Sequence, residues 1–175
     1  MTSNNHRTGD IILRHPRPGD MGWIVSANAE AYARDQGFDD RFETTCAEVV
    51  AGYLRSHDPA RERWWIAERD GVRVGSVGAM RASDDVAKLR VLYVDPSVRG
   101  MGLGRRLTRE CVRFCHDAGY TTLTLWTVDI LTAARRIYET EGFRLVHAEP
   151  YDGLGPLVSS ETWELTLQDW HANDH

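Results

Sequence analysis

A glycine-rich segment flanked by arginines carries the strongest chemical signal in the sequence, VDPSVRGMGLGRRL at residues 94–107. Its glycines alternate from Gly100 to Gly104, between an apolar run and a helix-like run. Where a strand, a glycine loop and a helix follow one another, uncovered backbone N–H groups at the helix start favour an anion such as phosphate. Arg99 and Arg105 can add charge-assisted hydrogen bonds. The segment predicts an anion site, and a turn that merely joins the strand to its helix is the alternative.

Two familiar phosphate-binding patterns do not fit this spacing. The dinucleotide pattern GxGxxG would need glycine where Arg105 or Leu107 stands. The P-loop pattern, GxxxxGK followed by Ser or Thr, has no match in the segment. The pattern that remains is Arg-x-x-Gly-x-Gly, formed by Arg99, Gly102 and Gly104.

A second group of chemically capable residues consists of Cys111, Cys115 and His116, on a stretch that is typical of a helix. Thiols four residues apart share one helix face, so the pair could bind a metal. They also fall on an apolar stripe, where buried thiols behave as small hydrophobic groups, and we therefore interpret them as core residues and expect no metal. With Cys46 the number of cysteines is odd and no disulfide framework is evident, which favours a reduced, cytoplasmic setting.

Composition is that of an ordinary soluble globular protein. Of the 175 residues, 42% are hydrophobic and 27% are charged. The formal net charge of -5 disfavours a nucleic-acid binder, which should carry a basic excess. Residues 1–9 are polar and lack a secretory signal, and no run approaches the roughly 18 apolar residues of a membrane span. We expect a cytoplasmic protein that binds neither nucleic acid nor a membrane.

The length of the chain suits one domain with a real core. Residues 1–9 and 171–175 are predicted as flexible tails. No low-complexity linker and no internal repeat lies between them, so residues 10–170 are predicted to form a single domain.

Hydrophobic periodicity and turn signals predict a mixed α/β fold of order βααβββαβαββ, with helices on both faces of the sheet. Asp70-Gly71 predicts a hairpin, and the run after it completes an antiparallel meander. Asp20 and Asp129 stand where they can cap helices. The expected strands span residues 10–15, 63–80 (two strands), 85–94, 121–128, 143–150 and 162–170, and the expected helices begin near residues 20, 39, 102 and 129.

Longer stretches give the chain a resemblance to a known family. VLYVDPSVRGMGLGRRL resembles the pyrophosphate-binding strand, loop and helix of the GNAT superfamily of N-acetyltransferases, and LTLWTVDILTAARRIYETEGFRLV resembles the strand, helix and strand start that follow. RPGDMGWIV, AKLRVLYV and LVSSETWELTL are more closely similar to acetyltransferase domains fused to MarR-type regulators, although the winged-helix part is absent here. The resemblance covers roughly residues 10–170 and implies a mostly antiparallel twisted sheet of six or seven strands flanked by four helices.

The resemblance implies an acetyl-CoA site on the glycine segment and on the strand before it. The backbone of Leu92, Tyr93 and Val94 would line the pantetheine arm, and an N–H near Leu92 or Tyr93 would donate to the developing oxyanion. The residues implied to hold the pyrophosphate are Arg99, Gly100, Met101, Gly102, Leu103, Gly104 and Arg105. The family often has an asparagine where Leu131 stands, so one side-chain contact to the coenzyme is missing.

Tyr138 is the catalytic residue that the resemblance implies. The tyrosine of the corresponding Ile-Tyr-Glu helix lies near the sulfur in the family, where it would supply a proton to the leaving thiolate. The alternative is a core tyrosine, because Ile137 and Phe143 are its neighbours in sequence.

The residue that takes a proton from the amine is not evident. Many family members carry a glutamate on the strand before the glycine loop, but VAKLRVLYV has no acid and places Lys88 and Arg90 there. A water chain, Glu30 on the first helix, or an acceptor that arrives neutral are the options that remain.

Lys88 and Arg90 are expected to share one face of their strand. They alternate with three apolar residues, Ala87, Leu89 and Val91. They could bind the carboxylate of an amino-acid-like acceptor, or form a solvated face with ion pairs. Trp126, at the end of the strand beside the coenzyme, is the tryptophan expected to touch a ligand.

The function that follows is an acetyl-CoA-dependent N-acetyltransferase acting on a primary amine of a small molecule. The acetyl group should pass directly, since no cysteine has the setting of a nucleophile. The alternatives are acetylation of a protein lysine or N-terminus and, in another class, a sensor that binds acyl-CoA without turnover. A homodimer is common in the resembled family and stays open for this chain.

Overall fold

The structure, a computed structural model, describes residues 9–171, and its elements follow the predicted order βααβββαβαββ. The strands are β1 (Ile11–Arg14), β2 (Arg63–Arg69), β3 (Val72–Arg81), β4 (Val86–Val94), β5 (Thr122–Val128), β6 (Arg144–Tyr151) and β7 (Val158–Thr166). The helices are α1 (Asp20–Gln36), α2 (Asp40–Ser56), α3 (Leu103–Asp117) and α4 (Thr132–Thr140), with a short 3-10 turn η1 (Pro96–Val98) before the glycine loop. The predicted tails, 1–9 and 171–175, lie outside the described residues apart from Gly9 and His171.

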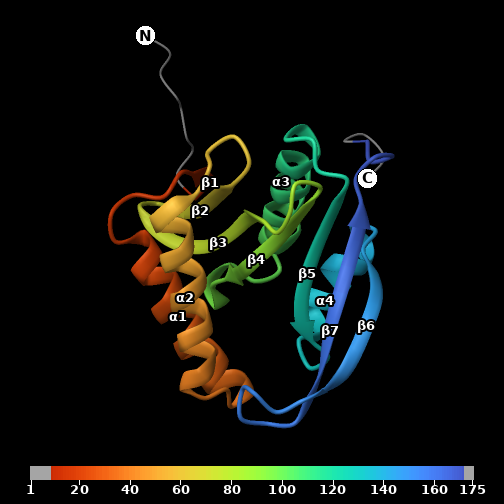
Figure 1. The fold of residues 1–175 in the computed structure, drawn as a ribbon. Helices are drawn as coiled ribbons and strands as arrows, with labels where there is room; N and C mark the ends of the chain where they lie inside the picture. The colour runs from red at the N-terminus through yellow and green to blue at the C-terminus, as the bar shows by residue number, and fades with distance from the viewer. Residues whose placement is uncertain (1–8, 172–175) are drawn as a thin grey trace.

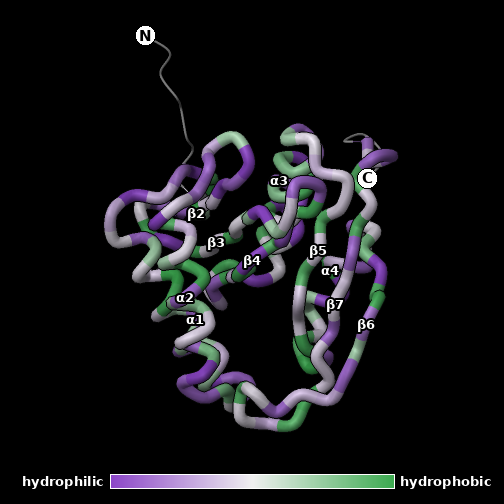
Figure 2. Tube along the Cα trace, viewed as in Figure 1, coloured by the Kyte–Doolittle hydropathy of each residue, from purple (hydrophilic) through white to green (hydrophobic). Residues whose placement is uncertain are grey.

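One sheet holds all seven of these strands in the order β1-β2-β3-β4-β5-β7-β6. Neighbouring strands are antiparallel except β4 and β5, which run parallel. Helices α1 and α2 cover one face, and α3 and α4 cover the other (Figure 1). Hydrophobic stretches follow the helices and strands, while the connecting loops are mainly hydrophilic (Figure 2). The predicted mixed, mostly antiparallel sheet flanked by four helices is therefore confirmed.

The apolar stripe of α3 fills the larger core between that helix and the sheet. Leu107, Cys111 and Cys115 recur at helical spacing and are completely buried. The two thiols are core residues, as their position on the stripe predicted. None of the helices within residues 9–171 combines the length and hydropathy that a membrane span requires.

The hairpin between β2 and β3 forms where Asp70-Gly71 predicted it. Both turn residues have positive φ, 49° at Asp70 and 78° at Gly71, as a type I′ turn requires. The hairpin aligns β2, β3 and β4 as the predicted antiparallel meander.

A β-bulge in β4 overturns the expected alternation of its side chains. Val91 has a φ of 49°, which is a strained value for a β-branched residue. Ser76 pairs with Tyr93 and Gly78 pairs with Arg90, so two residues of β4 oppose one residue of β3. Val91 consequently lies on the same side as Arg90, packed against the α1 and α2 core, and not on the opposite face with Leu89.

The bulge also separates β4 from β5. Their pairing extends only from Val86–Thr122 to Lys88–Thr124, although both strands continue beyond it. The Asp95 N–H donates to the Val74 carbonyl at 2.8 Å, on the β3 side. Because N–H directions alternate along a strand, those of Val94 and Leu92 point away from β3, into the gap that β5 leaves. An open cleft with free donors results in the middle of the sheet.

Two predicted helix caps are wrong in the same way. Helix α1 is capped by Gly19, and Asp20 inside it accepts hydrogen bonds from Arg14, Arg73 and the Arg17 N–H. Helix α4 begins only after Leu131, and Asp129 accepts from the Ser159 N–H at 2.9 Å. In both cases the carboxylate accepts hydrogen bonds from a different element instead of capping its helix. The spacing of residues in the sequence does not reveal such contacts between elements.

The last two strands are shifted from their predicted limits. Strand β7 begins at Val158, four residues before the expected start at 162. Tyr151 of β6 pairs with Val158, so the connecting loop is shorter than the glycine-rich stretch suggested.

Asp20 is a buried charge that ties the start of α1 to the sheet. Its side chain is 1% exposed and lies 2.6 Å from Arg14 and 2.7 Å from Arg73. Burial alone would raise its pKa, but hydrogen bonds from Arg14, the Arg17 N–H and Arg73 outweigh burial and lower the pKa to about 2. A lowered pKa means that the ionised form stabilises the fold above the unfolded value of about 3.9.

Asp20→Asn should lower the free energy of unfolding by about 2 kcal/mol at pH 7, because it removes the carboxylate that pairs with Arg73 and leaves Arg14 with Glu68 alone. The difference from wild type should shrink as pH falls from about 5 to 2, where Asp20 itself takes up a proton. Urea unfolding at both ends of that range measures it. The exposed Asp85→Asn is the control, and equal losses in both variants would contradict a special role for Asp20.

Candidate active site

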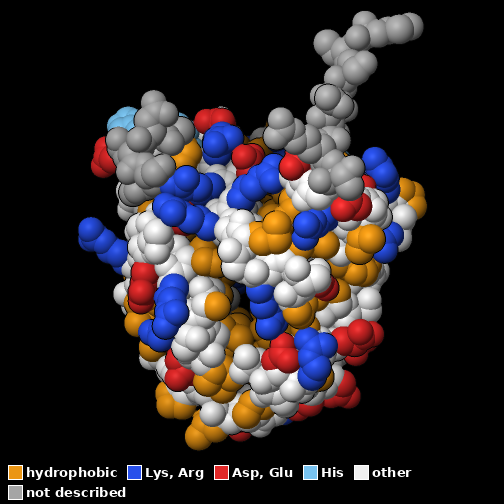
Figure 3. All heavy atoms as spheres, turned by 180° about the vertical axis from the view of Figure 1, so that it is seen from behind, with side chains coloured by type: hydrophobic (Ala, Val, Ile, Leu, Met, Phe, Trp, Pro, Cys, Tyr) orange, Lys and Arg blue, Asp and Glu red, His pale blue; other side chains and the backbone are white. Residues whose placement is uncertain are grey.

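The gap between β4 and β5 holds two connected depressions. The first, called here the glycine-loop pocket, has a volume of about 640 Å³ and lies between the glycine loop and α4. The second, called the aromatic cavity, has a volume of about 150 Å³ and lies between β4, β5, α1 and α2. Seen from behind, the surface is hollowed near its centre, with Lys and Arg side chains on the rim (Figure 3).

The glycine loop presents free backbone donors to its pocket. Gly102 caps α3 with a φ of 75° and offers no side-chain oxygen to the helix start. The Met101 N–H reaches the Val98 carbonyl at 3.4 Å, and helical bonding resumes only when Arg106 donates to the Gly102 carbonyl. Within residues 9–171, the N–H groups from Gly102 to Arg105 have no carbonyl partner. The loop therefore presents the free N–H groups that the sequence predicted, and an anion bound to them stays a prediction.

The three glycines serve two different purposes. Gly100 and Gly102 have φ values of 78° and 75°, and an added Cβ would meet nothing within 4 Å. Glycine is needed there for the left-handed backbone. Gly104 is different, because its Cβ would lie 2.7 Å from Cδ1 of Ile137. Gly104 permits close packing of α3 against α4, and Ile137 in turn lines the pocket.

Six of the seven residues predicted to hold the pyrophosphate line the pocket, and two of the six are cations. The six are Arg99, Gly100, Gly102, Leu103, Gly104 and Arg105. Nε of Arg105 lies 2.6 Å from Glu141, which fixes the arginine at the rim, and Nη2 of Arg99 lies 3.4 Å from Asp35 across the pocket. Met101 lies outside the lining, with its sulfur 3.8 Å from Arg69. Arg136 of α4 is a further lining cation that the sequence reasoning missed.

The strand residues expected at the pantetheine arm lie between the two depressions. Leu92, Tyr93 and Val94 line the glycine-loop pocket, and Leu92 lines the aromatic cavity as well. The residues shared by both depressions are Tyr32, Leu92, Leu131 and Ala134. These four define the junction at which a group held in one depression meets a group held in the other. Leu131, where the family often has asparagine, makes that junction more apolar.

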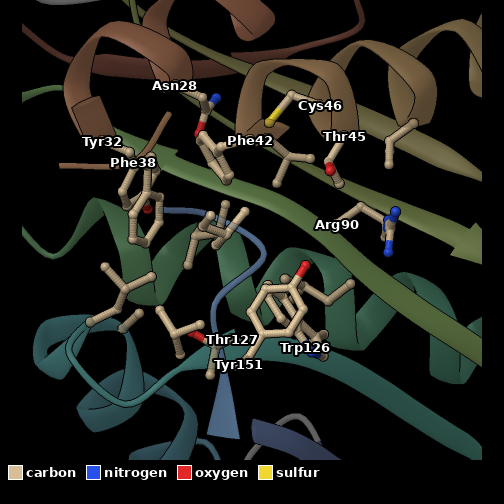
Figure 4. Close-up of a pocket in the computed structure, with 18 of the residues that line it drawn as sticks. Asn28, Tyr32, Phe38, Phe42, Thr45, Cys46, Arg90, Trp126, Thr127 and Tyr151 are labelled. Atoms are coloured by element: carbon tan, nitrogen blue, oxygen red, sulfur yellow. The ribbon is translucent and has the colours of Figure 1, made fainter. Parts of the chain in front are cut away.

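Aromatic rings form two walls of the cavity (Figure 4). Tyr32, Phe38 and Phe42 make one wall, with ring centroids 4.9 to 5.7 Å apart. Trp126 and Tyr151 make the other, edge to face at 5.4 Å. Trp126 is thus in the cavity, where the sequence placed a ligand contact, and is 40% exposed.

Tyr138 lies in the cavity wall and is buried. Its ring packs against Phe143 at 5.7 Å, as the alternative of a core tyrosine expected. Its hydroxyl, however, forms no hydrogen bond with any residue of the described chain. Burial raises the pKa of Tyr138 well above its usual value, and nearby Tyr32 adds to the shift. Tyr138 therefore keeps its hydroxyl proton and lines the aromatic cavity.

No carboxylate among the described residues lines the aromatic cavity. Glu30 is exposed on α1 and lies outside the linings of both depressions. The buried acids Asp20, Glu141 and Glu161 are each held by arginines. The strand-borne cations differ from each other, since Arg90 lines the cavity and Lys88 does not.

Asn28 is a cavity residue that sequence reasoning missed. It is 1% exposed on α1, and its amide nitrogen donates to the Ile24 carbonyl at 2.7 Å. Its oxygen points into the cavity (Figure 4). A signal existed, because Asn28 is a polar residue on the stripe that also carries Ile24 and Ala31.

The arrangement of strand, glycine loop and cleft matches a described family. The model of the acetyltransferase (GNAT) family matches residues 27–143, which contain β4, the glycine loop, α3, β5 and α4. The chain belongs to the acetyltransferase (GNAT) family. The expected family is thus confirmed, while the closer similarity to MarR-fused domains is not among the findings.

Two curated relatives and one solved structure are similar to the chain. N-acetylaspartate synthetase of Danio rerio is 33% identical over 62% of the chain, and the probable N-acetyltransferase family 8 member 5 of Mus musculus is 32% identical over 58%. The chain spans only 38% and 45% of their lengths. A solved structure with the same fold is that of yncA, a candidate acetyltransferase of Salmonella typhimurium solved with its cofactor acetyl-CoA. The TM-score is 0.70 at 20% sequence identity, and the match covers 94% of this chain and 98% of that one.

Gly102→Ala should weaken coenzyme A binding about tenfold, because a left-handed alanine strains the loop and shifts the free amides at which we expect the coenzyme to bind. Gly119→Ala is a matched control, since Gly119 also has positive φ and open space but lies outside the pocket. Calorimetric titration with coenzyme A measures both. Both variants should lose about 1 kcal/mol of stability. Equal affinity in the two variants would contradict the role of the loop.

Proposed function

We propose that this GNAT protein is an N-acetyltransferase that moves the acetyl group of acetyl-CoA directly to a primary amine of a small molecule. The observation that carries the proposal is the run of free N–H groups from Gly102 to Arg105, open to a pocket that joins the aromatic cavity. An anion site and an apolar cavity that meet at one junction suit a charged carrier and a separate acceptor.

The residues of the glycine-loop pocket fit coenzyme A. Free amides and Arg99 and Arg105 suit its diphosphate, and Arg136 adds a third cation to the same pocket. The apolar lining along Leu92 and Val94, with N–H groups directed into the gap, suits an extended amide-bearing arm. Acetyl-CoA, when bound, supplies an acetyl group activated as a thioester.

The chain's own residues then have three tasks. The N–H groups of Leu92 and Val94 orient the acyl carbonyl and stabilise negative charge on its oxygen. Tyr138 holds a proton at its Oη and donates it towards the leaving sulfur. The walls of the cavity hold the amine in line. The amine proton leaves to solvent, since the described cavity lining contains no carboxylate base, and solvent returns a proton to Tyr138 after it has protonated the sulfur.

Several finer expectations belong to this proposal. A cytoplasmic location is supported by three cysteines that are all free and buried. Absence of nucleic acid and membrane partners is supported by the net charge of -5. The likeness to MarR-fused acetyltransferase domains rests on the quoted motifs, and a homodimer rests on the family alone.

Incubation with acetyl-CoA and a panel of small primary amines should release free thiol above background, with an acetylated product seen by mass spectrometry. Turnover is expected because the two depressions meet at the Leu92 junction. Coenzyme binding without thiol release for any amine would overturn the proposal in favour of a sensor. Acetylation of peptides alone would favour a protein acetyltransferase.

Tyr138→Phe should lower kcat about 100-fold while coenzyme affinity and the unfolding midpoint stay near wild type, because only a proton donor is lost. Tyr120→Phe, a buried tyrosine outside both depressions, is the control and should keep kcat. Thiol release under saturating substrates measures the effect.

The pH profile gives the same prediction a second readout. The wild-type rate should rise as the amine loses its proton and hold its plateau beyond pH of about 10, since burial raises the pKa of Tyr138 and keeps the hydroxyl protonated. A decline centred near the usual tyrosine pKa, or unchanged kcat in Tyr138→Phe, would remove the proton-donor role.

A further inference from the structure

Arg90 is a partly buried cation without a partner. It projects from β4 into the aromatic cavity, and it forms no ion pair or hydrogen bond with any residue in 9–171. Other arginines that are only partly exposed do have partners: Arg14 and Arg73 pair with Asp20, Arg109 with Glu141 and Arg135 with Glu161. Arg61 donates to two backbone carbonyls, and Arg63 lies over the Phe114 ring. A guanidinium cannot shed its proton at neutral pH, so a half-buried one is stabilised by an anion.

The surroundings of Arg90 make an anionic partner still more favourable. Burial lowers the pKa of Arg90, and both burial and the neighbouring Arg90 charge lower the pKa of Lys88. Two cations therefore lie on one face of β4, and the described lining of the cavity includes no acid to balance them. An anionic ligand would supply the missing charge, and a planar carboxylate matches the guanidinium fork.

The remainder of the cavity selects an apolar group. The Tyr32, Phe38 and Phe42 wall faces the Trp126 and Tyr151 wall across the space beside Arg90 (Figure 4). Flat rings on two sides suit an aromatic or large aliphatic side chain. A second carboxylate would have no cation of its own, because Lys88 lies outside the lining.

The spacing along β4 fits an amine and a carboxylate on one molecule. Leu92 lines the junction with the glycine-loop pocket, and Arg90 lies two residues before it. Two residues span at most about 7 Å, and the bulge at Val91 shortens that distance. The flexible side chain of Arg90 covers part of that span, so a carboxylate on Arg90 leaves an α-amino group close to the junction. The Asn28 oxygen points into the same space and can accept from that amine.

We propose that the acceptor is an amino acid with an aromatic or large aliphatic side chain, whose carboxylate pairs with Arg90 and whose side chain lies between the two aromatic walls. This rests on the proposed acetyl transfer and names its substrate class. Protein lysine is disfavoured, because its side chain brings a further cation to Arg90 and Lys88.

The test compares phenylalanine with phenethylamine, which lacks the carboxylate, with phenylalanine amide, in which it is neutral, and with aspartate. Wild type should prefer phenylalanine to each of the other three by at least tenfold in kcat/KM. Arg90→Gln should lower kcat/KM for phenylalanine 30-fold or more and leave phenethylamine within about threefold. Arg90→Lys should recover part of the loss, since it restores the charge without the fork.

Arg55→Gln is the matched control, because it removes an arginine charge from the exposed end of α2, away from the cavity. It should change none of these ratios. Coenzyme A affinity, measured by calorimetry, verifies that each variant is folded. Trp126 supplies a readout that needs no turnover, since N-acetylphenylalanine should quench its fluorescence in wild type and at least tenfold more weakly in Arg90→Gln.

The outcomes separate this inference from the proposed function. Coenzyme binding with no acetylation of any amine overturns the proposed function, and N-acetylphenylalanine binding that depends on Arg90 would still support the anion subsite. Equal use of phenylalanine and phenethylamine, with a ratio that Arg90→Gln leaves unchanged, overturns the inference while acetyl transfer stands. A preference for aspartate or for peptide lysine also overturns it.

Discussion

The β-bulge at Val91 is the constraint on which the cleft depends. An extra residue in β4 opposite β3 bends the strand, and its parallel pairing with β5 ends at Lys88. A regular strand would have continued the ladder, and the N–H groups of Leu92 and Val94 would then bond to β5. The strained backbone of Val91 is held in place because its side chain packs into the core of α1 and α2. The backbone strain at Val91 and the opening of the cleft therefore have the same origin, the bulge at this residue.

Charge is distributed around that cleft according to a simple division. The buried carboxylates Asp20, Glu141 and Glu161 each form ion pairs with arginines and so link neighbouring elements. Glu141 holds Arg105 at the glycine loop, and Glu161 fixes α4 through Arg135. Among the described residues that line the two depressions, the loop amides and Arg90 have no partner. This distribution of charge supports the proposal that both depressions bind anions, because the buried carboxylates nearby already have arginine partners.

Local patterns in the sequence were sufficient for the order of elements, the hairpin at Asp70-Gly71 and the free amides of the glycine loop, because each depends on a few consecutive residues. Contacts between distant elements were not accessible in the same way. The caps assigned to Asp20 and Asp129 failed when Arg73 and Ser159 supplied other donors. Period-two alternation placed Val91 on the wrong face, since a bulge forms only against the partner strand. The aromatic cavity joins α1, α2, β5 and the β6–β7 loop, and no single segment predicts it.

The lack of a carboxylate base in the described cavity lining follows from the same electrostatics that make the cavity receptive to an anion. An acid placed beside Arg90 would pair with it and occupy the site that a substrate anion needs. An apolar, cation-bearing cavity instead disfavours a bound ammonium, and burial and the Arg90 charge lower the pKa of Lys88, outside the cavity lining, for the same reasons. In the acetyl transfer that we propose, the same two influences, desolvation and neighbouring positive charge, act on the acceptor amine at the junction. They shift its proton equilibrium towards the neutral, nucleophilic form, so that the environment supplies much of what a general base would otherwise provide.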